Sequence, residues 1–461
     1  MKLKLKNIGL LDHAELELGA LTVICGENNS GKTYINYALY GFLRLWRQIL
    51  TAELMGILEP LWKKGNRFEL DLEALIEKYD LLPRICREYA EQLPAVFAAQ
   101  AERFKDSEFE LILEHKPNLR EKPFERSIRL EKSGPVSITL NIMVGSPNLE
   151  VVLAETVSIS RYAGLQIIAD AVAVILFGSF LPNTFIASAE RTGAAIFRKE
   201  LDFARSKLLD AIARGEASEL NNPFHLMRVT EAAYAYPVRD NVDFVRSLDN
   251  LGKQPPGPLL SQHPDLLEDF EDIIGGSYKV IPNEGVYFSP KGTKQPRLNL
   301  SESSSAVRAL LDIGFFLRHN IEAGDMLMID EPELNLHPKN QRKLARLLVR
   351  LVNAGVRVFI TTHSDYIVKE FNTLIMLNRD TANARAVQKQ FKYRDDERLN
   401  LNDVRLYMTE ELPRAKGKRS KGYTVKRAAI DAIQGIEVQT FDKTIDEMNR
   451  IQEELLYGED A

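Results

Sequence analysis

One stretch of eight residues near the start of this 461-residue chain restricts its fold more than any other feature. The segment GENNSGKT, residues 26–33, satisfies the pattern G-x-x-x-x-G-K-[ST] in full. An apolar run at residues 21–25 predicts a strand before it, and the pattern after it predicts a helix that reaches Leu43. Glycines in such a loop let backbone N–H groups approach phosphate oxygens, and the start of the helix favours anions. The sequence therefore predicts a parallel α/β sheet that binds a nucleotide.

The residues of this loop have separate expected roles in binding ATP and Mg²⁺. The lysine is expected to reach the β- and γ-phosphates, and the threonine hydroxyl is expected to bind Mg²⁺. A glycine turn that binds no nucleotide is the alternative, and the flanking strand and helix argue against it. The predicted nucleotide-binding residues are Gly26, Glu27, Asn28, Asn29, Ser30, Gly31, Lys32 and Thr33.

A pair of acidic residues far downstream supplies the second part of the predicted site. The apolar run from Met326 to Ile329 is typical of a buried parallel strand, and it ends at Asp330 and Glu331. Asp330 is expected to bind Mg²⁺ through the coordinated water of the metal, and Glu331 to orient or deprotonate the attacking water. An isolated Asp-Glu pair is often only a solvated strand end, but this pair accompanies a complete phosphate-binding loop.

His363 is the third candidate, and it closes another predicted strand. After a helix at residues 338–353, the apolar β-branched run that begins at Val356 ends at His363. A single histidine is more often structural, yet open α/β sheets bind their ligands at the carboxyl ends of the strands. We therefore expect His363 to contact the γ-phosphate or the attacking water.

Four serines occur within residues 301–305, directly before an apolar helical pattern that starts near Ala306. They could be ordinary N-caps of that helix. Alternatively, their hydroxyls and the free N–H groups at the helix start donate to phosphate, provided that the charge of Glu302 points away. The candidates for this phosphate contact are Ser301, Ser303 and Ser304.

The order of these motifs resembles that of the ABC-class ATPases of the SMC, RecF and OLD group. In that family two heads enclose ATP, and a Leu-Ser-Gly-Gly signature of one head closes over the γ-phosphate bound by the other. Leu300 and Ser301 match this signature, whereas Glu302 and Ser303 stand where the family has glycines. The resemblance implies an ABC-type ATPase head, with a P-loop parallel sheet, an antiparallel β lobe and a helical insertion. It also implies a homo-oligomer of dimeric heads.

Three further segments narrow the resemblance to the ABC ATPases of anti-phage defence systems of the PARIS type. They are the opening residues 3–33, the segment FIASAERTGA at 185–194 and the segment DVRLYMTEE at 403–411. The resemblance implies a Toprim-type nuclease subunit as partner, which the ATPase releases when it senses a phage anti-restriction protein that mimics DNA. It also implies that this chain has no nuclease site, and only scattered acids such as Asp395 occur after the ATPase motifs.

Two other functions stay open at this point. The chain could be a DNA-repair or chromosome-maintenance ATPase of the RecF type that acts directly on DNA, or a scaffold in which ATP is only structural. The formal net charge of −5 argues against a generally basic nucleic-acid binder, so any such contact needs a local patch. The basic run at residues 414–427 is either a solvated loop or a contact for nucleic acid or for an acidic protein that mimics DNA.

The composition favours the cytoplasm, and the resemblance to phage-defence ATPases implies a prokaryote. Two cysteines, Cys25 and Cys86, allow no disulfide framework. The opening MKLKLKNIGL lacks the apolar core of a signal peptide, and its alternation of lysine and leucine predicts an edge strand. The apolar segment 163–181 contains Gln166 and Asp170, which favour a buried helix over a membrane span.

These observations divide the chain into six expected parts, because the motifs of the ATPase head are spread over separate segments. The expected parts are 1–43, the first part of the head with the P-loop; 44–123, a helical insertion; 124–193, the β lobe and a return to the core; 194–290, a second helical insertion; 291–380, the part of the head with the serine-rich segment, the Asp-Glu strand and the His strand; and 381–461, a C-terminal extension.

Overall fold

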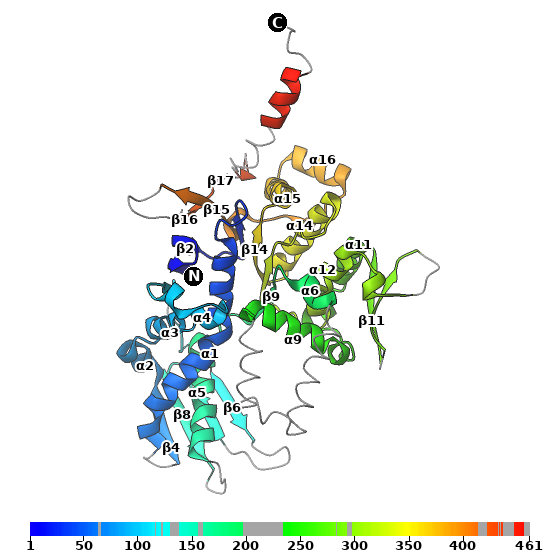
Figure 1. Ribbon diagram of the computed structural model, residues 1–461. Coiled ribbons are helices and arrows are strands. Elements are labelled where there is room, and N and C mark those ends of the chain that lie inside the picture. Colours follow the sequence, from blue (N-terminus) through cyan, green and yellow to red (C-terminus); the bar gives the residue numbers. More distant parts are fainter. Residues whose placement is uncertain are drawn as a thin grey trace, which may run out of the picture.

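The computed structural model describes most of the chain, and Figure 1 shows how its elements are arranged around a central sheet. The described residues are 1–62, 66–115, 117–120, 123–129, 138–154, 160–196, 234–282, 284–292, 297–413, 422–431, 433, 435–436 and 447–455.

A sheet of nine strands forms the centre of the molecule. Its strands are β1 (Lys2–Ile8), β2 (Leu11–Glu17), β3 (Leu21–Cys25), β5 (Glu108–Ile112), β9 (Thr184–Ala187), β13 (Met326–Asp330), β14 (Arg357–Thr362), β15 (Val404–Leu412) and β16 (Gly422–Arg427). Their order is β5-β1-β2-β16-β15-β3-β14-β13-β9. The five strands from β15 to β9 run parallel, and most of the others pair antiparallel. The predicted α/β class, with a parallel P-loop sheet beside an antiparallel part, is confirmed.

The parallel strands are apolar throughout because helices cover both faces of the sheet. Every residue of β3 and β13 is buried, as expected for strands that are covered on both sides. Met328 packs with α1 (Lys32–Trp62) and α5 (Arg161–Phe177) in one core. Its neighbour Ile329 packs on the opposite face with α14 (Pro338–Asn353) and α15 (Asp365–Leu377).

β1 is not the edge strand that its lysines predict, so that prediction is wrong. β5 lies outside it and pairs with it. Lys6 Nζ binds Glu108 Oε1 at 2.6 Å, and Lys4 Nζ lies 3.5 Å from Glu110 Oε2. The lysines are exposed charges that face acids of the neighbouring strand, an arrangement that stabilises antiparallel pairs.

A second lobe surrounds the far end of α1, which continues well past Leu43 (Figure 1). Its antiparallel sheet has the order β4-β8-β7-β6 and is separate from the main sheet. The range 44–123, expected to be helical, therefore also supplies β4 to this sheet and β5 to the central one. The elements of this part are β4 (Arg67–Asp71), α2 (Leu72–Tyr79), α3 (Leu81–Ala90), α4 (Leu93–Val96), β6 (Phe124–Ile128), β7 (Ile138–Ile142) and β8 (Asn148–Leu153).

α5 contains the apolar segment that raised the question of a membrane span. Among the residues that the structure describes, none forms a helix that is long and apolar enough to cross a membrane. Asp170 of α5 forms two hydrogen bonds with the guanidinium of Arg47 on α1. The polar residue that interrupts this segment is thus paired within the protein.

A third group of elements leads from the sheet edge at β9 to the serine-rich segment. In Figure 1, α6 and α12 lie close together near β9. Residues 197–233 of the expected second insertion lie outside the described residues. The elements of this group are α6 (Arg191–Ile196), α9 (Tyr236–Leu251), α10 (Pro258–Gln262), α11 (Asp265–Ile274), β10 (Gly276–Ile281), β11 (Gly285–Pro290), β12 (Leu298–Asn299), α12 (Ser305–Ala309) and α13 (Leu311–His319).

The C-terminal part contributes β15 and β16 to the central sheet and adds α16 (Ala382–Phe391), β17 (Ile430–Asp431) and β18 (Gly435–Ile436). Most of the basic run, residues 414–421, lies outside the described residues. In β16, Lys426 lies 3.6 Å from Glu410, and Arg427 binds Glu17 at 2.8 Å. These two basic residues are therefore paired within the chain.

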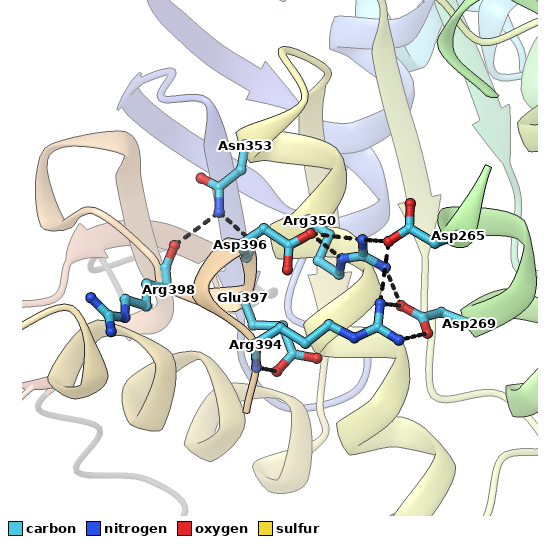
Figure 2. Close-up of polar contacts among 8 residues, drawn as sticks. All are labelled: Asp265, Asp269, Arg350, Asn353, Arg394, Asp396, Glu397 and Arg398. Atoms are coloured by element: carbon cyan, nitrogen blue, oxygen red, sulfur yellow. Dashed lines mark hydrogen bonds and ion pairs between the residues drawn. The ribbon is translucent and has the colours of Figure 1, made fainter. Parts of the chain in front are cut away.

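A buried arginine joins three parts of the chain around α14 (Figure 2). The Arg350 side chain is 3% exposed, and its guanidinium binds Asp265 and Asp269 of α11 and Asp396, which follows α16. Arg394 also binds Asp269, at 2.9 Å. Two arginines thus bind three aspartates. These ion pairs hold α11, which precedes the serine-rich segment in the chain, against α14.

We expect Arg350→Met to lower the free energy of unfolding by about 2 kcal/mol, because it leaves carboxylates without their buried partner. The aspartates are partly exposed, so solvent screens part of the loss. Burial raises the pKa of Asp265, but the hydrogen bond and charge of Arg350 outweigh it and hold this pKa below its usual value. The contribution is therefore present above about pH 4 and is lost as the pH falls further.

Urea unfolding at about pH 7 and about pH 3.5 measures both effects, since the two values lie on either side of the usual aspartate pKa. Arg385→Met is the control, because Arg385 pairs with Asp380 on the surface, where an ion pair contributes only about 0.5 kcal/mol. Equal losses for the two variants at neutral pH, or a loss for Arg350→Met that persists unchanged in acid, contradict the expected role of the cluster.

Candidate nucleotide-binding site

The three segments predicted to carry the chemistry end side by side at one edge of the parallel sheet. β14 lies between β3 and β13. In the register of these strands, Thr362 lies opposite Cys25, and Thr361 lies opposite Asp330. The P-loop, His363 and the Asp-Glu pair therefore follow adjacent strands at their carboxyl ends, where α/β sheets bind ligands. The structure thus brings these three groups together.

The P-loop has a backbone that requires its glycines. Gly26 and Gly31 have φ values of 153° and 96°, which residues with a side chain rarely adopt. A Cβ atom on Gly26 would lie 1.8 Å from Thr409 Oγ1, and one on Gly31 would lie 2.7 Å from Leu11 Cδ2. The Thr409 hydroxyl also donates to Ser30 Oγ at 2.7 Å. Neighbouring strands therefore fit closely around the loop and leave no room for larger residues.

Lys32 is folded into the loop that it closes. Its ammonium donates to the carbonyl oxygens of Gly26 at 2.8 Å and Glu27 at 2.6 Å, and the residue is 5% exposed. Burial lowers the pKa of Lys32, whereas the charges of Glu331 and Asp330 raise it. The acids at the end of β13 thus lie close enough to act on the positive charge of the P-loop.

Asp330 has a buried carboxylate, and one of its two oxygens is without a hydrogen bond from any described residue. It is 1% exposed; its Oδ1 accepts a hydrogen bond from the Thr361 hydroxyl, and its Oδ2 has no hydrogen-bond partner within the described part of the chain. Burial raises the pKa of Asp330 to about 6, which the Thr361 hydroxyl opposes and the charge of Glu331 reinforces. Thr33, exposed at the start of α1, also acts on this carboxyl group. A free carboxylate oxygen near a threonine hydroxyl suits a hard cation such as Mg²⁺.

Glu331 follows β13 in an unusual backbone conformation. Its φ is 52°, in the left-handed region that residues other than glycine rarely enter. Its N–H donates to the carbonyl oxygen of Thr361 at 3.0 Å. His363 Nδ1 lies 3.7 Å from Glu331 Oε1 and 3.1 Å from Glu333 Oε1. The imidazole therefore lies within reach of two carboxylates from the turn after β13.

Glu333 is a residue of this site that the sequence analysis missed. It is buried, and its Oε1 accepts hydrogen bonds from the Thr362 hydroxyl at 2.9 Å and the His363 N–H at 2.7 Å. These bonds fix the turn after β14 against the turn after β13. The only signal in the sequence was a second acid two positions after Glu331, in Asp-Glu-Pro-Glu.

The serine-rich segment lies apart from the P-loop of the same chain. It begins in a short 3-10 turn, Leu300–Glu302, and continues into α12, which packs beside α6 after the edge strand β9. Two strands, β14 and β13, separate β9 from β3. Because neighbouring strands lie about 4.8 Å apart, β9 and β3 are about 14 Å apart. The serine-rich segment thus lies on the side of the sheet edge, away from the strand that leads into the P-loop.

The three candidate serines differ in what their hydroxyls do. Ser301 is exposed. Ser303 is buried and donates to the carbonyl oxygen of Leu300 at 2.6 Å. Ser304 is the N-cap of α12, since its side chain accepts a hydrogen bond from the Val307 N–H at 3.3 Å. Ser301 is therefore the candidate whose hydroxyl is best placed to meet a second molecule.

The carboxylate of Glu302 accepts hydrogen bonds from its own segment. Its Oε2 accepts hydrogen bonds from the backbone N–H of Asn299 at 2.8 Å and from the Asn299 side chain at 3.2 Å. This capping box turns the carboxylate back toward its own segment. The acid that replaces a glycine of the signature thus has a partner within its own turn.

The sequence also matches a known family over most of these elements. The profile of the AAA ATPase domain family, AAA_15, matches residues 1–130 and 219–368, more than half of the chain. The chain belongs to this AAA ATPase domain family. Both matched ranges reach the site, so the P-loop, the Asp-Glu pair and His363 all lie within the AAA ATPase domain. No curated protein matches the sequence.

Solved SMC head domains align with nearly the whole of this chain, but with low TM-scores. The SMC head domain from Thermotoga maritima is 13% identical over 93% of this chain and 98% of its own, with a TM-score of 0.31. The Smc head domain from Pyrococcus furiosus, bound to the C-terminal domain of ScpA, is 13% identical over 98% of both chains, with a TM-score of 0.32. Scores this low carry no argument about the present chain.

Over the ranges that the structure describes, no three or more His, Cys, Asp and Glu side chains gather in a way that could hold a metal ion.

Proposed function

We propose that this AAA ATPase domain binds and hydrolyses Mg²⁺-ATP at the sheet edge where the P-loop, Asp330, Glu331 and His363 meet. The adjacency of these three strand ends is the observation that carries the proposal. N–H groups of the glycine-bearing loop and the start of α1 favour phosphate oxygens. Lys32 adds a positive charge at the same place.

Each acidic and polar group then has a specific task. Thr33 and the uncommitted Oδ2 of Asp330 hold Mg²⁺, which neutralises charge on the phosphates. Glu331 accepts a proton from the attacking water. His363 donates to the γ-phosphate. The Glu333 carboxylate holds His363 in place, because it contacts both the backbone N–H and the imidazole ring of that histidine.

We further propose that the site is completed by a second copy of the chain, so that the heads act as a dimer within a homo-oligomer. The serine-rich segment packs beside α6 at the sheet edge formed by β9, and β13 and β14 lie between that edge and the strand that leads into the P-loop. A two-fold dimer of heads brings the segment of each copy to the P-loop of the other. Ser301 is then the residue that donates to the γ-phosphate, because Ser303 already donates to Leu300 and the oxygen of Ser304 is held at the start of α12 as its cap.

Ser301→Arg should lower ATP hydrolysis by more than about 10-fold and leave ATP binding to a single head within about threefold of wild type, because the bulky side chain acts only at the interface between heads. Phosphate release and titration of a fluorescent ATP analogue measure the two properties. Ser261→Arg, a change at another exposed serine, serves as the control. Unchanged hydrolysis in Ser301→Arg would make the serine-rich segment a helix cap only.

At the level of the cell, we propose that the ATPase is the sensor and scaffold of a cytoplasmic anti-phage complex in a prokaryote. The resemblance to AriA, the ATPase subunit of the PARIS system, supports this assignment. The chain then holds a Toprim-type nuclease subunit and releases it when a phage anti-restriction protein that mimics DNA is bound.

Co-expression with a Toprim-type nuclease tests this assignment. The two chains should co-purify in the presence of ATP, and an added DNA-mimic protein should release the nuclease, whereas an equally acidic protein without the mimic's shape should not. ATP-dependent binding of duplex DNA without any nuclease association would instead favour a RecF-type repair ATPase. Steady ATP binding with no phosphate release over long time courses would favour a structural role for ATP.

A further inference from the structure

Arg191 is a buried arginine that binds four backbone carbonyl oxygens from separate parts of the chain. It is the first residue of α6 and is 1% exposed. Nη1 donates to Ser188 at 2.9 Å and to Asp330 at 2.6 Å. Nη2 donates to Glu331 at 2.7 Å, and Nε donates to Ala309 at 2.8 Å. One side chain thus joins β9, the end of β13 and the end of α12.

Two of these bonds fix the backbone on both sides of Glu331. The carbonyl groups of Asp330 and Glu331 belong to the peptide groups before and after the Glu331 Cα, and the same guanidinium holds both. Between these two held peptide groups, Glu331 has a left-handed φ of 52°. Such a conformation persists only where the surroundings determine it. Arg191 therefore helps to set the direction in which the Glu331 side chain leaves the backbone.

The bond to Ala309 leads to the serine-rich segment. Ala309 is the last residue of α12, the helix that starts directly behind the candidate serines. The preceding residue, Arg308, donates through Nη1 to the carbonyl oxygens of Leu300 and Ser303. A continuous series of hydrogen bonds therefore runs from the 3-10 turn that contains Ser301, through α12 and Arg191, to Glu331.

Geometry explains why an arginine occupies this costly position. Burial lowers the pKa of Arg191, and the charges of Asp312 and Asp330 oppose that effect. Within the described part of the chain, the hydrogen bonds of its guanidinium go to carbonyl oxygens, so the residue is not held there as one half of an ion pair. A planar fork of N–H donors reaches three elements at once, which a single ammonium or amide group does not.

We propose that Arg191 is a positioning residue that couples the serine-rich segment to Glu331. When α12 shifts as the segment meets nucleotide held by a second copy, the guanidinium moves the peptide groups around Glu331 with it. ATP bound by one copy then acts on the catalytic carboxylate of the other. The inference rests on the proposed function, because it takes Glu331 as the group that accepts the proton of water.

Arg191→Lys tests the coupling, because it keeps the charge and most of the volume but removes the fork. We expect its kcat to fall by about 10-fold or more, while its Kd for a fluorescent ATP analogue stays within about threefold of wild type. Arg350→Lys is the matched control: Arg350 is also buried, but it binds carboxylates away from the site. The control should lower Tm and keep the wild-type kcat. A folded Arg191→Lys chain with kcat within about twofold of wild type, or equal losses of kcat in both variants, overturns the proposal.

Hydrogen exchange on the unaltered chain gives a second test that needs no variant. Addition of ATP and Mg²⁺ should change the protection of the α12 amides and of the amides of residues 330, 331, 333 and 334 together. A change in one group without the other overturns the coupling. If Lys32→Ala and Glu331→Gln retain wild-type hydrolysis, the proposed function itself fails. If those two variants are inactive and Arg191→Lys is not impaired, only the coupling fails.

Discussion

Lys32→Ala should reduce ATP affinity and ATP hydrolysis by at least about 100-fold, because the loop loses the ammonium that meets phosphate oxygens. The loss should show in ATP binding itself, and not only in turnover, since this charge lies in the P-loop beside Gly26 and Glu27. Titration with a fluorescent ATP analogue and steady-state phosphate release measure the two effects. The fold should stay intact, because the change removes only two hydrogen bonds to backbone carbonyl groups within one loop.

Lys78→Ala is a suitable control for this prediction. Lys78 is an exposed lysine on α2, far along the chain from the P-loop, and its removal should change neither property. Wild-type ATP binding by Lys32→Ala would show that the loop is a glycine turn that takes no part in ATP binding.

Glu331→Gln should separate ATP binding from ATP turnover. The amide has nearly the same size as the carboxylate but does not accept the proton of water, so kcat should fall by about 100-fold to 10,000-fold. ATP binding should persist, since Lys32, Thr33 and Asp330 are unchanged. The variant should also accumulate as an ATP-bound dimer, because ATP that is not hydrolysed stays between the two copies that the proposed site joins.

Phosphate release and size-exclusion chromatography with ATP measure these effects. Glu322→Gln, at an exposed glutamate before β13, should behave as wild type. A wild-type kcat in Glu331→Gln would show that this residue does not accept the proton of water. Glu333 and His363 would then be the candidates for that role.

The groups at the sheet edge were predictable because each local pattern is complete in itself. Gly26 and Gly31 mark positive φ angles, and the apolar runs before Asp330 and His363 mark buried strands. Parallel strands bring their carboxyl ends to one edge, so the proximity of these residues follows from the strand pattern. Their assigned roles remain predictions.

Features that depend on distant parts of the chain were not predictable in this way. The lysines of β1 indicated an edge strand, but the acids of β5 that cover it lie about a hundred residues away. The range 44–123 was expected to be helical, yet β4 and β5 form there because partner strands elsewhere accept them. Long-range pairing overrides the local pattern in both cases.

The serines and Arg191 show a similar limit at the level of side chains. Sequence reasoning treated Ser303 and Ser304 as equal to Ser301, but the first donates to Leu300 and the second caps α12. Arg191 was visible only as part of an Ala-Glu-Arg strand end, and its four carbonyl partners come from three separate points of the chain. Hydrogen-bond partners of this kind are set by the packed fold.

Assembly of one ATP site from two copies of the chain is the central claim, and mixing two inactive variants tests it most directly. Lys32→Ala lacks a working P-loop, and Ser301→Arg lacks a working serine-rich segment. In a mixed dimer, the P-loop of the Ser301→Arg copy meets the intact segment of the Lys32→Ala copy. A mixed dimer then has one complete site of its two, so co-expressed variants purified through two different tags should recover hydrolysis to at most about half of the wild-type rate. Doubly purified dimers that hydrolyse no more ATP than either variant alone would contradict the assembly of one site from two copies.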